Sequence, residues 1–382
     1  MKHALRNTAA VLALAASTCV FAQQGPIQII GLMELSGTGA TAGTNFDNGV
    51  KLAVKEINAS GGILGRKIDY QSWDTQTAPQ TAKALAQKAV DQGAYVVMGP
   101  VFSGSIIVSM AETKRAEIPN FTGGEAANIT EQGNPYIFRT SFTQATAMPK
   151  VARYLKDQVK AKSVAVMWVN NDFGKGGRDA ITKALSAEGI KVAADISTDP
   201  GQVDFSGPVL KAKQSNADAL FVYTNEEESA RALRELKKQG YDKPIVGETT
   251  LTGQKVIELA GDAANGAVAH VGLTVDAPQP QIKAFDEKFQ KEYKYKSDHN
   301  GMKGYSGMYV VKAVTEKIGK IDPKAFAKAM HGATILVKDQ PGVLLDVHFD
   351  DKGDLDRESF LVKVVNGKQV VTTTLPPLFP IK

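Results

Sequence analysis

Cysteine is almost absent from this chain of 382 residues, occurring once, at Cys19. Residues 1–22 consist of a short basic start, the uncharged apolar stretch AAVLALAASTCVF and small residues ahead of a cleavage point after Ala22, which is the pattern of a secretory signal. The alternatives are a buried N-terminal helix and a lipid anchor on Cys19, although Thr18 stands where such sites usually have Gly, Ala or Ser. Cleavage removes the cysteine, so we expect a chain exported to a bacterial periplasm, with no disulfide and no thiol ligand or nucleophile.

The sequence also lacks long apolar runs, basic blocks and histidine clusters. After residue 22 no apolar run reaches membrane length. The 45 Lys and Arg residues against 40 Asp and Glu give a formal charge of +5, and the loss of Lys2 and Arg6 with the signal leaves +3 (43 against 40). These charges are interspersed, so we expect no nucleic-acid partner. The five histidines show no metal-ligand spacing and no G-x-S-x-G motif occurs, so we expect no metal site and no serine nucleophile.

What the chain does contain is a regular alternation of short apolar runs and amphipathic segments. Predicted strands at residues 27–33, 67–73, 94–99 and 118–122 are separated by stretches with helical spacing. The alternation restarts at residues 163–169 and continues to residue 248. Two such series predict an α/β fold with two doubly wound parallel-sheet lobes, made of right-handed crossover units. Further helices follow, and the strand-like end carries the hairpin turns DDKGD and NGK.

A glycine-rich loop, GTGATA at residues 37–42, fits the dinucleotide fingerprint G-x-G-x-x-(G/A). The spacing argues against a nucleotide, because several residues separate the first strand from the glycines and the next strand-ending acid, Asp74, is too far along the chain. We therefore expect no cofactor. A glycine-rich turn before a helix still leaves backbone amides free and lets a ligand or a facing wall approach closely.

Two further helix starts are candidates for binding. In GPVFSGS, residues 99–105, Ser103 and Gly104 lie where a strand ends and a helix begins. Unpaired amides, the positive helix end and a hydroxyl together suit a carboxylate, although an N-cap serine is common by itself. The acid cluster EEE at residues 226–228 is interpreted as ordinary, because acids are frequent in the first turn of a helix.

The long stretch from Ser36 to Val90, SGTGATAGTNFDNGVKLAVKEINASGGILGRKIDYQSWDTQTAPQTAKALAQKAV, resembles a family. It is similar to the periplasmic substrate-binding proteins of branched-chain amino acid ABC importers, the type I leucine/isoleucine/valine-binding group. Further matches, among them GPVFSGS, IPNFTGG, NNDFGKGG, ADALFVY and FDDKGDL, extend over nearly all of the chain after the signal.

The resemblance implies two lobes joined by a hinge of three crossovers, near residues 142, 272 and 349. Residues 23–142 and 273–349 would form the first lobe, and residues 143–272 and 350–382 the second. The lobes would close on a small solute by a shift of population. The implied partners are an ABC permease and its ATPase subunits at the inner membrane, to which a monomeric, non-enzymatic protein delivers the solute.

Carried over position by position, the resemblance also implies binding residues. The carboxylate site falls on Ser103 with amides from Gly104 and Gly124. The remaining contacts fall on Glu125, Phe173, Thr224, Asn225, Thr249 with Glu248 beside it, and Ala42 on the opening loop.

Two of these positions depart from the family. Where the family tends to have Thr and then Glu, this chain has Glu125 and then Thr249. If Glu125 faces the cleft, a carboxylate for an α-ammonium group survives on the opposite lobe, and a branched-chain or related amino acid is the expected solute. If it faces solvent, the solute is an aromatic or aliphatic carboxylate, or an amide. Two other functions stay open: a periplasmic sensor with the same fold, and an enzyme that uses the glycine-rich loop.

Overall fold

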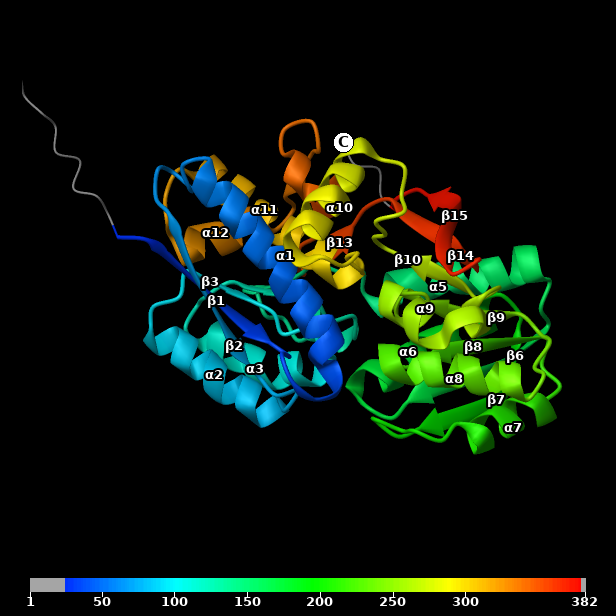
Figure 1. Cartoon of the computed structure of the whole chain (residues 1–382). Coiled ribbons are helices and arrows are strands. Elements are labelled where there is room, and N and C mark those ends of the chain that lie inside the picture. The colour runs from blue at the N-terminus through cyan, green and yellow to red at the C-terminus, as the bar shows by residue number, and fades with distance from the viewer. Residues whose placement is uncertain (1–24, 379–382) are drawn as a thin grey trace, which may run out of the picture.

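The structure is a computed structural model that describes residues 25–378 of the chain. The predicted signal, residues 1–22, lies outside this range. Within the described range, no helix has the length and apolar character needed to cross a membrane. Figure 1 shows two lobes side by side, the first drawn in blue, cyan and orange and the second mainly in green with red strands.

The first lobe is built on a parallel sheet in the order β2-β1-β3-β4-β5. Its strands are β1 (Ile27–Met33), β2 (Ile68–Asp74), β3 (Val96–Met98), β4 (Asn120–Thr122) and β5 (Ile137–Arg139). The helices between them are η1 (Gly37–Gly39), α1 (Ala40–Ala59), α2 (Pro79–Asp91), α3 (Ser103–Arg115) and α4 (Asn128–Glu131), and α10 (Pro280–Tyr293), α11 (His299–Ile318) and α12 (Pro323–Met330) return to the same lobe.

Both faces of this sheet are covered by helices. Ile30 and Leu32 belong to an apolar cluster with Ala86 of α2, whereas Ile29 and Met33 belong to the cluster that contains α1 and α11. Alternate residues of β1 are therefore buried on opposite faces, as expected for a parallel strand inside a doubly wound sheet.

The second lobe is built on a sheet in the order β15-β14-β10-β9-β8-β6-β7. Its strands are β6 (Ser163–Val169), β7 (Lys191–Thr198), β8 (Ala219–Tyr223), β9 (Ile245–Glu248), β10 (Val268–Val271), β14 (Ser359–Val365) and β15 (Lys368–Leu375). The helices are α5 (Gln144–Tyr154), η2 (Leu155–Val159), α6 (Asp172–Ala187), α7 (Ser206–Gln214), α8 (Glu226–Lys238), η3 (Thr249–Leu251), α9 (Gln254–Ala260) and η4 (Gly261–Ala264). The first five strands in the sequence pair in parallel, and β14 and β15 are antiparallel.

Both predicted C-terminal turns join antiparallel strands. A small sheet consists of β11 (Thr334–Ile335), β12 (Val347–Phe349) and β13 (Leu355–Asp356), with η5 (Pro341–Val343) between β11 and β12, and the DDKGD turn joins β12 to β13. The NGK turn joins β14 to β15, and Asn366 and Gly367 have φ values of 49° and 72° there, as a two-residue hairpin of this kind requires.

The strand pairing bears on the position of the third crossover. The sequence suggests residue 349, but β12 ends there and pairs with β13, so the chain is still in the small sheet at Asp356. The next strand, β14, begins at Ser359 in the second lobe's sheet. We therefore propose that this crossover lies between residues 356 and 359.

Glycines bring α1 and α11 into direct backbone contact. A Cβ on Gly49 would lie 1.9 Å from the carbonyl oxygen of Gly301, and one on Gly304 would lie 2.1 Å from the carbonyl oxygen of Phe46. The absence of side chains at these positions lets the helices pack closely. This contact fixes the start of α11, which faces the gap between the lobes.

Candidate functional site

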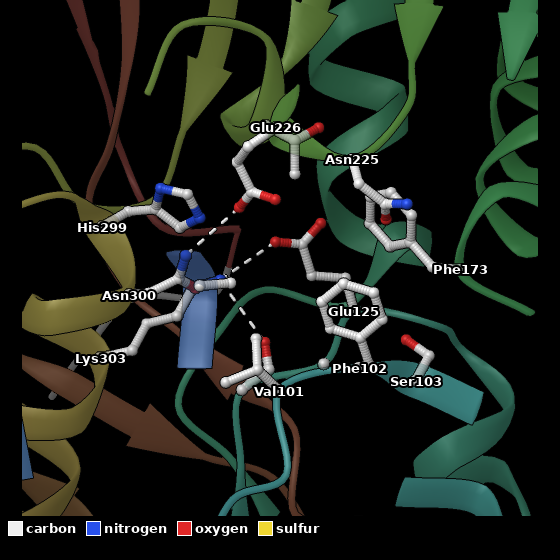
Figure 2. A pocket seen from close by; sticks show the side chains of 14 residues that line it. Val101, Phe102, Ser103, Glu125, Phe173, Asn225, Glu226, His299, Asn300 and Lys303 are labelled. Atoms are coloured by element: carbon white, nitrogen blue, oxygen red, sulfur yellow. Dashed lines mark hydrogen bonds and ion pairs between the residues drawn. The ribbon is translucent and has the colours of Figure 1, made fainter. Parts of the chain in front are cut away.

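A cavity lies between the two lobes, with an empty volume of about 370 Å³ that includes space open to solvent. Both lobes contribute to it, because α1, α3 and α11 line it from the first lobe and α6 and α8 from the second. Figure 2 shows its labelled side chains. The lining residues are Ala42, Val101, Phe102, Ser103, Gly123, Gly124, Glu125, Phe173, Asn225, Glu226, Thr250, His299, Asn300 and Lys303.

Six of the ten residues expected from the sequence line this cavity: Ala42, Ser103, Gly124, Glu125, Phe173 and Asn225. The other four lie close by but do not line it. Gly104 faces Asp172 of the opposite lobe, and the hydroxyl of Thr224 is hydrogen-bonded to Ser229 at 2.8 Å. Glu248 is buried against His270, and Thr249 lines a second, neighbouring pocket.

The glycine-rich loop contributes less than the sequence suggests. Residues 37–39 form the short helix η1 and residues 40–42 begin α1. The Gly39 amide donates to Thr77 Oγ1 at 3.0 Å, and Ser36 Oγ donates to Asp74 at 2.6 Å. A Cβ on Gly39 would lie 2.7 Å from the ring of Phe102. The loop is therefore packed against its own lobe, and Ala42 is the member of GTGATA that reaches the cavity.

The start of α3 has the geometry of an anion site. Phe102 is the N-cap residue, which makes no side-chain capping bond, and the first helical hydrogen bond runs from Ile106 N to Phe102 O. The amides of Ser103 and Gly104 precede that bond. Ser103 is 2% exposed, and its Oγ accepts from the amide of Ala126 at 3.3 Å, so its own hydroxyl proton remains to be donated. Free amides and a hydroxyl at a helix N-terminus favour a carboxylate.

Glu125 faces the cavity and joins the lobes. Its Oε1 lies 3.2 Å from Lys303 Nζ, and its Oε2 accepts from the hydroxyl of Tyr223, in the second lobe, at 3.0 Å. Burial, and after it the charge of the neighbouring Glu248, raise the pKa of Glu125 to about 7 against the opposing effect of Lys303. The first of the two alternatives left open by the sequence, a cleft-facing Glu125, is the arrangement in the structure.

Lys303 is the cation among several buried acids. It is 4% exposed and lowers the pKa values of Glu226, Glu248 and Asp298, all of which burial raises. For Glu226 the pKa is about 8 and for Asp298 about 6. Four carboxyl groups therefore surround one ammonium group, and this arrangement favours a ligand with a positive charge of its own.

The three consecutive glutamates at residues 226–228 have three different environments. Glu228 forms a capping box with Asn225 at the start of α8. Glu227 accepts from Thr41 Oγ1 of the first lobe at 2.6 Å. Glu226 lines the cavity, where it is 5% exposed. The interpretation of this cluster as an ordinary first helical turn holds for Glu228 alone, because closing the lobes brings the other two against α1 and the cavity.

Aromatic side chains form part of the cavity wall. The Phe173 ring stacks on Tyr223 with a centroid distance of 4.1 Å and an interplanar angle of 24°. Gln144 Nε2 donates to the Tyr223 hydroxyl at 3.0 Å, which orients that hydroxyl toward Glu125. Phe173, Phe102 and Val101 line the cavity and give it an apolar side next to its charged side.

Sequence reasoning missed the contribution of α11. His299, Asn300 and Lys303 lie in its first turn and a half, downstream of the N-cap residue Asp298. The available signal was a lone lysine among glycines and apolar residues in HNGMKGYSGMYVV. In residues 25–378 no group of three or more His, Cys, Asp or Glu side chains has a metal-binding arrangement.

Comparison with known proteins identifies the family to which this chain belongs. The family model described as "Periplasmic binding protein" matches residues 26–369. The chain belongs to the periplasmic binding protein family. This is a family of solute-binding proteins, and its two-lobed architecture agrees with the sheets described above.

Several curated relatives are similar over nearly their whole length. The leucine-, isoleucine-, valine-, threonine- and alanine-binding protein of Pseudomonas aeruginosa is 27% identical over 350 residues, which are 91% of this chain and 90% of that protein. The Leu/Ile/Val-binding protein BraC3 of Rhizobium johnstonii is 29% identical over 345 residues, 89% of this chain and 92% of that protein.

Solved structures share the fold at lower identity. The substrate-binding protein LivJ of Streptococcus pneumoniae, in complex with isoleucine, has a TM-score of 0.82 at 23% identity and covers 93% of this chain and 100% of its own. A solute-binding protein from R. palustris, in complex with benzoate, has a TM-score of 0.84 at 21% identity, covering 93% and 98%. These structures establish the type I periplasmic binding fold, with two parallel-sheet lobes joined by a three-crossover hinge.

Proposed function

We propose that this protein is the periplasmic solute-binding component of an ABC importer, and that it captures a small amino acid of the branched-chain or a related type. The observation that supports the solute class is the cavity between the lobes. It pairs an anion site at the start of α3 with the buried carboxyl groups of Glu125 and Glu226. An amino acid carries the two charges that these ends complement.

The relatives support the same class. The curated relatives are named for leucine, isoleucine and valine. The apolar side of the cavity, formed by Val101, Phe102 and Phe173, accommodates an aliphatic side chain. A plain aromatic acid such as benzoate, which one structural neighbour binds, would place its only charge near several buried acids, and this makes it the second candidate.

The remaining parts of the proposal concern the setting of the protein. Cleavage after Ala22 releases it into the periplasm as a monomer, and the closed form delivers its solute to a permease driven by ATPase subunits. The proposal includes no catalysis on the solute. Glu125 also joins the two lobes, through its contacts with Lys303 and with the hydroxyl of Tyr223.

Mass spectrometry tests this function. The protein is purified from a periplasmic extract, denatured, and the released small molecules are identified. We expect an amino acid with a small aliphatic side chain and a mature N-terminus at Gln23. Released nucleotide, or a solute without an acid group, would contradict the proposed solute class. Titration calorimetry with the identified compound should then give a Kd of about 1 μM or lower, about −8 kcal/mol.

A further inference from the structure

The buried carboxyl groups around Lys303 differ in how well they are paired. Glu125 is bonded to Lys303 at 3.2 Å and to the hydroxyl of Tyr223 at 3.0 Å. Glu248 lies 3.1 Å from His270 Nδ1 and also accepts from the amide of Thr249. Both of these acids therefore have their partners within the protein.

Asp298 is likewise satisfied. As the N-cap residue of α11 it accepts from the amides of Asn300 at 2.8 Å and Gly301 at 3.2 Å. Its carboxylate caps the N-terminus of α11, and we expect replacement of Asp298 mainly to lower the stability of this helix.

Glu226 is the exception. Besides its own backbone amide, its carboxylate has as a donor Asn300 Nδ2 at 3.4 Å, which is longer than a usual hydrogen bond, and within residues 25–378 it forms no ion pair. It is nevertheless 95% buried, being 5% exposed, and it lines the cavity. Figure 2 shows the carboxyl groups of Glu226 and Glu125 pointing into the same space from opposite lobes. A buried and weakly paired carboxyl group stays protonated, with a raised pKa, and ionises readily only when a positive group lies beside it.

We propose that Glu226 binds the positively charged group of the solute and is the residue that selects amino acids over plain carboxylates. The inference rests on the proposed function and assigns one residue within the site. The resemblance to the family places the ammonium-binding position at Thr249, which lines a neighbouring pocket here and carries no charge. Glu226 provides the missing charge from the first turn of α8, on the same lobe.

The competing explanation is that Glu226 only stabilises the start of α8, as acids in a first helical turn do. The two explanations differ in what a neutral side chain does. For a helix-stabilising acid, Glu226→Gln lowers the stability of the solute-free protein and leaves the choice of solute unchanged. For a solute-binding acid, the substitution changes the choice of solute and does not lower the stability of the solute-free protein.

The test uses two probes that differ in one group. L-leucine and its deaminated analogue 4-methylpentanoate are titrated by calorimetry into the wild type, Glu226→Gln and the matched control Glu227→Gln. Glu227 is the next residue in the same turn, but it accepts from Thr41 and does not line the cavity. For the wild type we expect leucine to bind more tightly than 4-methylpentanoate. Glu226→Gln should reduce that ratio about 10- to 100-fold, as expected for a lost charge-assisted hydrogen bond, and Glu227→Gln should leave the ratio unchanged.

Two results would overturn the assignment. One is an unchanged ratio in Glu226→Gln together with a lower midpoint of thermal unfolding for the solute-free variant. The other is a wild-type protein that prefers 4-methylpentanoate. If neither probe binds, the ratio is measured with the solute released from the purified protein and its deaminated analogue; a released solute without a positive group refutes the role of Glu226 and leaves solute capture standing. Absence of any released or bound solute refutes the proposed function itself.

Discussion

Glu226 and Glu125 keep their protons to a high pH because both carboxyl groups are buried beside other acids. The pKa of Glu226 is raised to about 8 and that of Glu125 to about 7, and Glu34, which accepts from the amides of Val101 and Phe102, is also raised to about 7. The charged groups that face Glu226 are Lys303 and Asp298 of α11 and Glu227 of α8. In the unfolded chain such carboxyls titrate near 4.5, so the folded protein binds more protons than the unfolded chain at neutral pH.

The first prediction concerns the stability of the solute-free protein against pH. Burial lowers the pKa values of His270, to about 3, and His299. Histidines of the unfolded chain titrate near pH 6.5, so their opposing slope fades as pH rises and is small above about pH 7.5. Between pH 6.5 and 8.5 the raised acids dominate, and the free energy of unfolding should fall as pH rises. Glu226→Gln should remove up to about 2 kcal/mol of that fall. Urea unfolding at several pH values measures it, and a stability that rises over this range would contradict the assigned pKa values.

The sequence predicted some residues of the site and missed others. Ser103 was predictable from its local pattern, a strand end followed by a helix start, whereas Gly124 and Glu125 were expected only from the resemblance to the family. All three follow strands of the first sheet, and the ends of parallel strands meet at one edge. Glu226 was set aside because its local pattern, an acid in a first helical turn, is common. Its burial comes from the approach of the other lobe, and the sequence around it carries no sign of that approach.

At the scale of elements, the contact between α1 and α11 positions the missed residues. These helices come from distant parts of the sequence, and their contact depends on glycines that a periodicity argument treats as neutral. The helices and the alternation of strands were predictable from apolar spacing. The glycine contact between α1 and α11 was not predictable, because it depends on two helix surfaces that meet only after folding.

The second prediction tests that contact. Gly304→Ala places a Cβ 2.1 Å from the carbonyl oxygen of Phe46, so α11 must move away from α1, at a cost of about 1–3 kcal/mol. Because Lys303 precedes Gly304, we also expect weaker binding of the solute. Gly207→Ala is the matched control: Gly207 also lies in a helix, α7, but a Cβ there meets no atom within 4 Å, and its stability should stay equal or rise slightly. Equal unfolding midpoints for the two variants would contradict the role of the contact.

At the scale of the whole molecule, the structure is that of the closed lobes. The side-chain hydrogen bonds that cross the gap include those of Thr41 with Glu227, Tyr223 with Glu125, and Asn300 with Glu226. The last two border the cavity, whereas the hydrogen bond of Thr41 lies at its rim, where both residues are half-buried. That bond stabilises the closed form without touching the solute, so it adds to the apparent affinity through the population of closed protein.

The third prediction follows from that position. Thr41→Val removes the hydroxyl donor and keeps the shape of the side chain, so the closed form loses one charge-assisted hydrogen bond at a partly exposed site. We expect the solute to bind about 2- to 10-fold more weakly and small-angle scattering of the solute-free variant to give a larger radius of gyration than the wild type. Thr44→Val, at an exposed position one turn further along α1, should change neither quantity. If Thr41→Val scatters and binds like the wild type, closure depends on the cavity contacts alone, and the hydrogen bond at the rim is a consequence of closure rather than one of its causes.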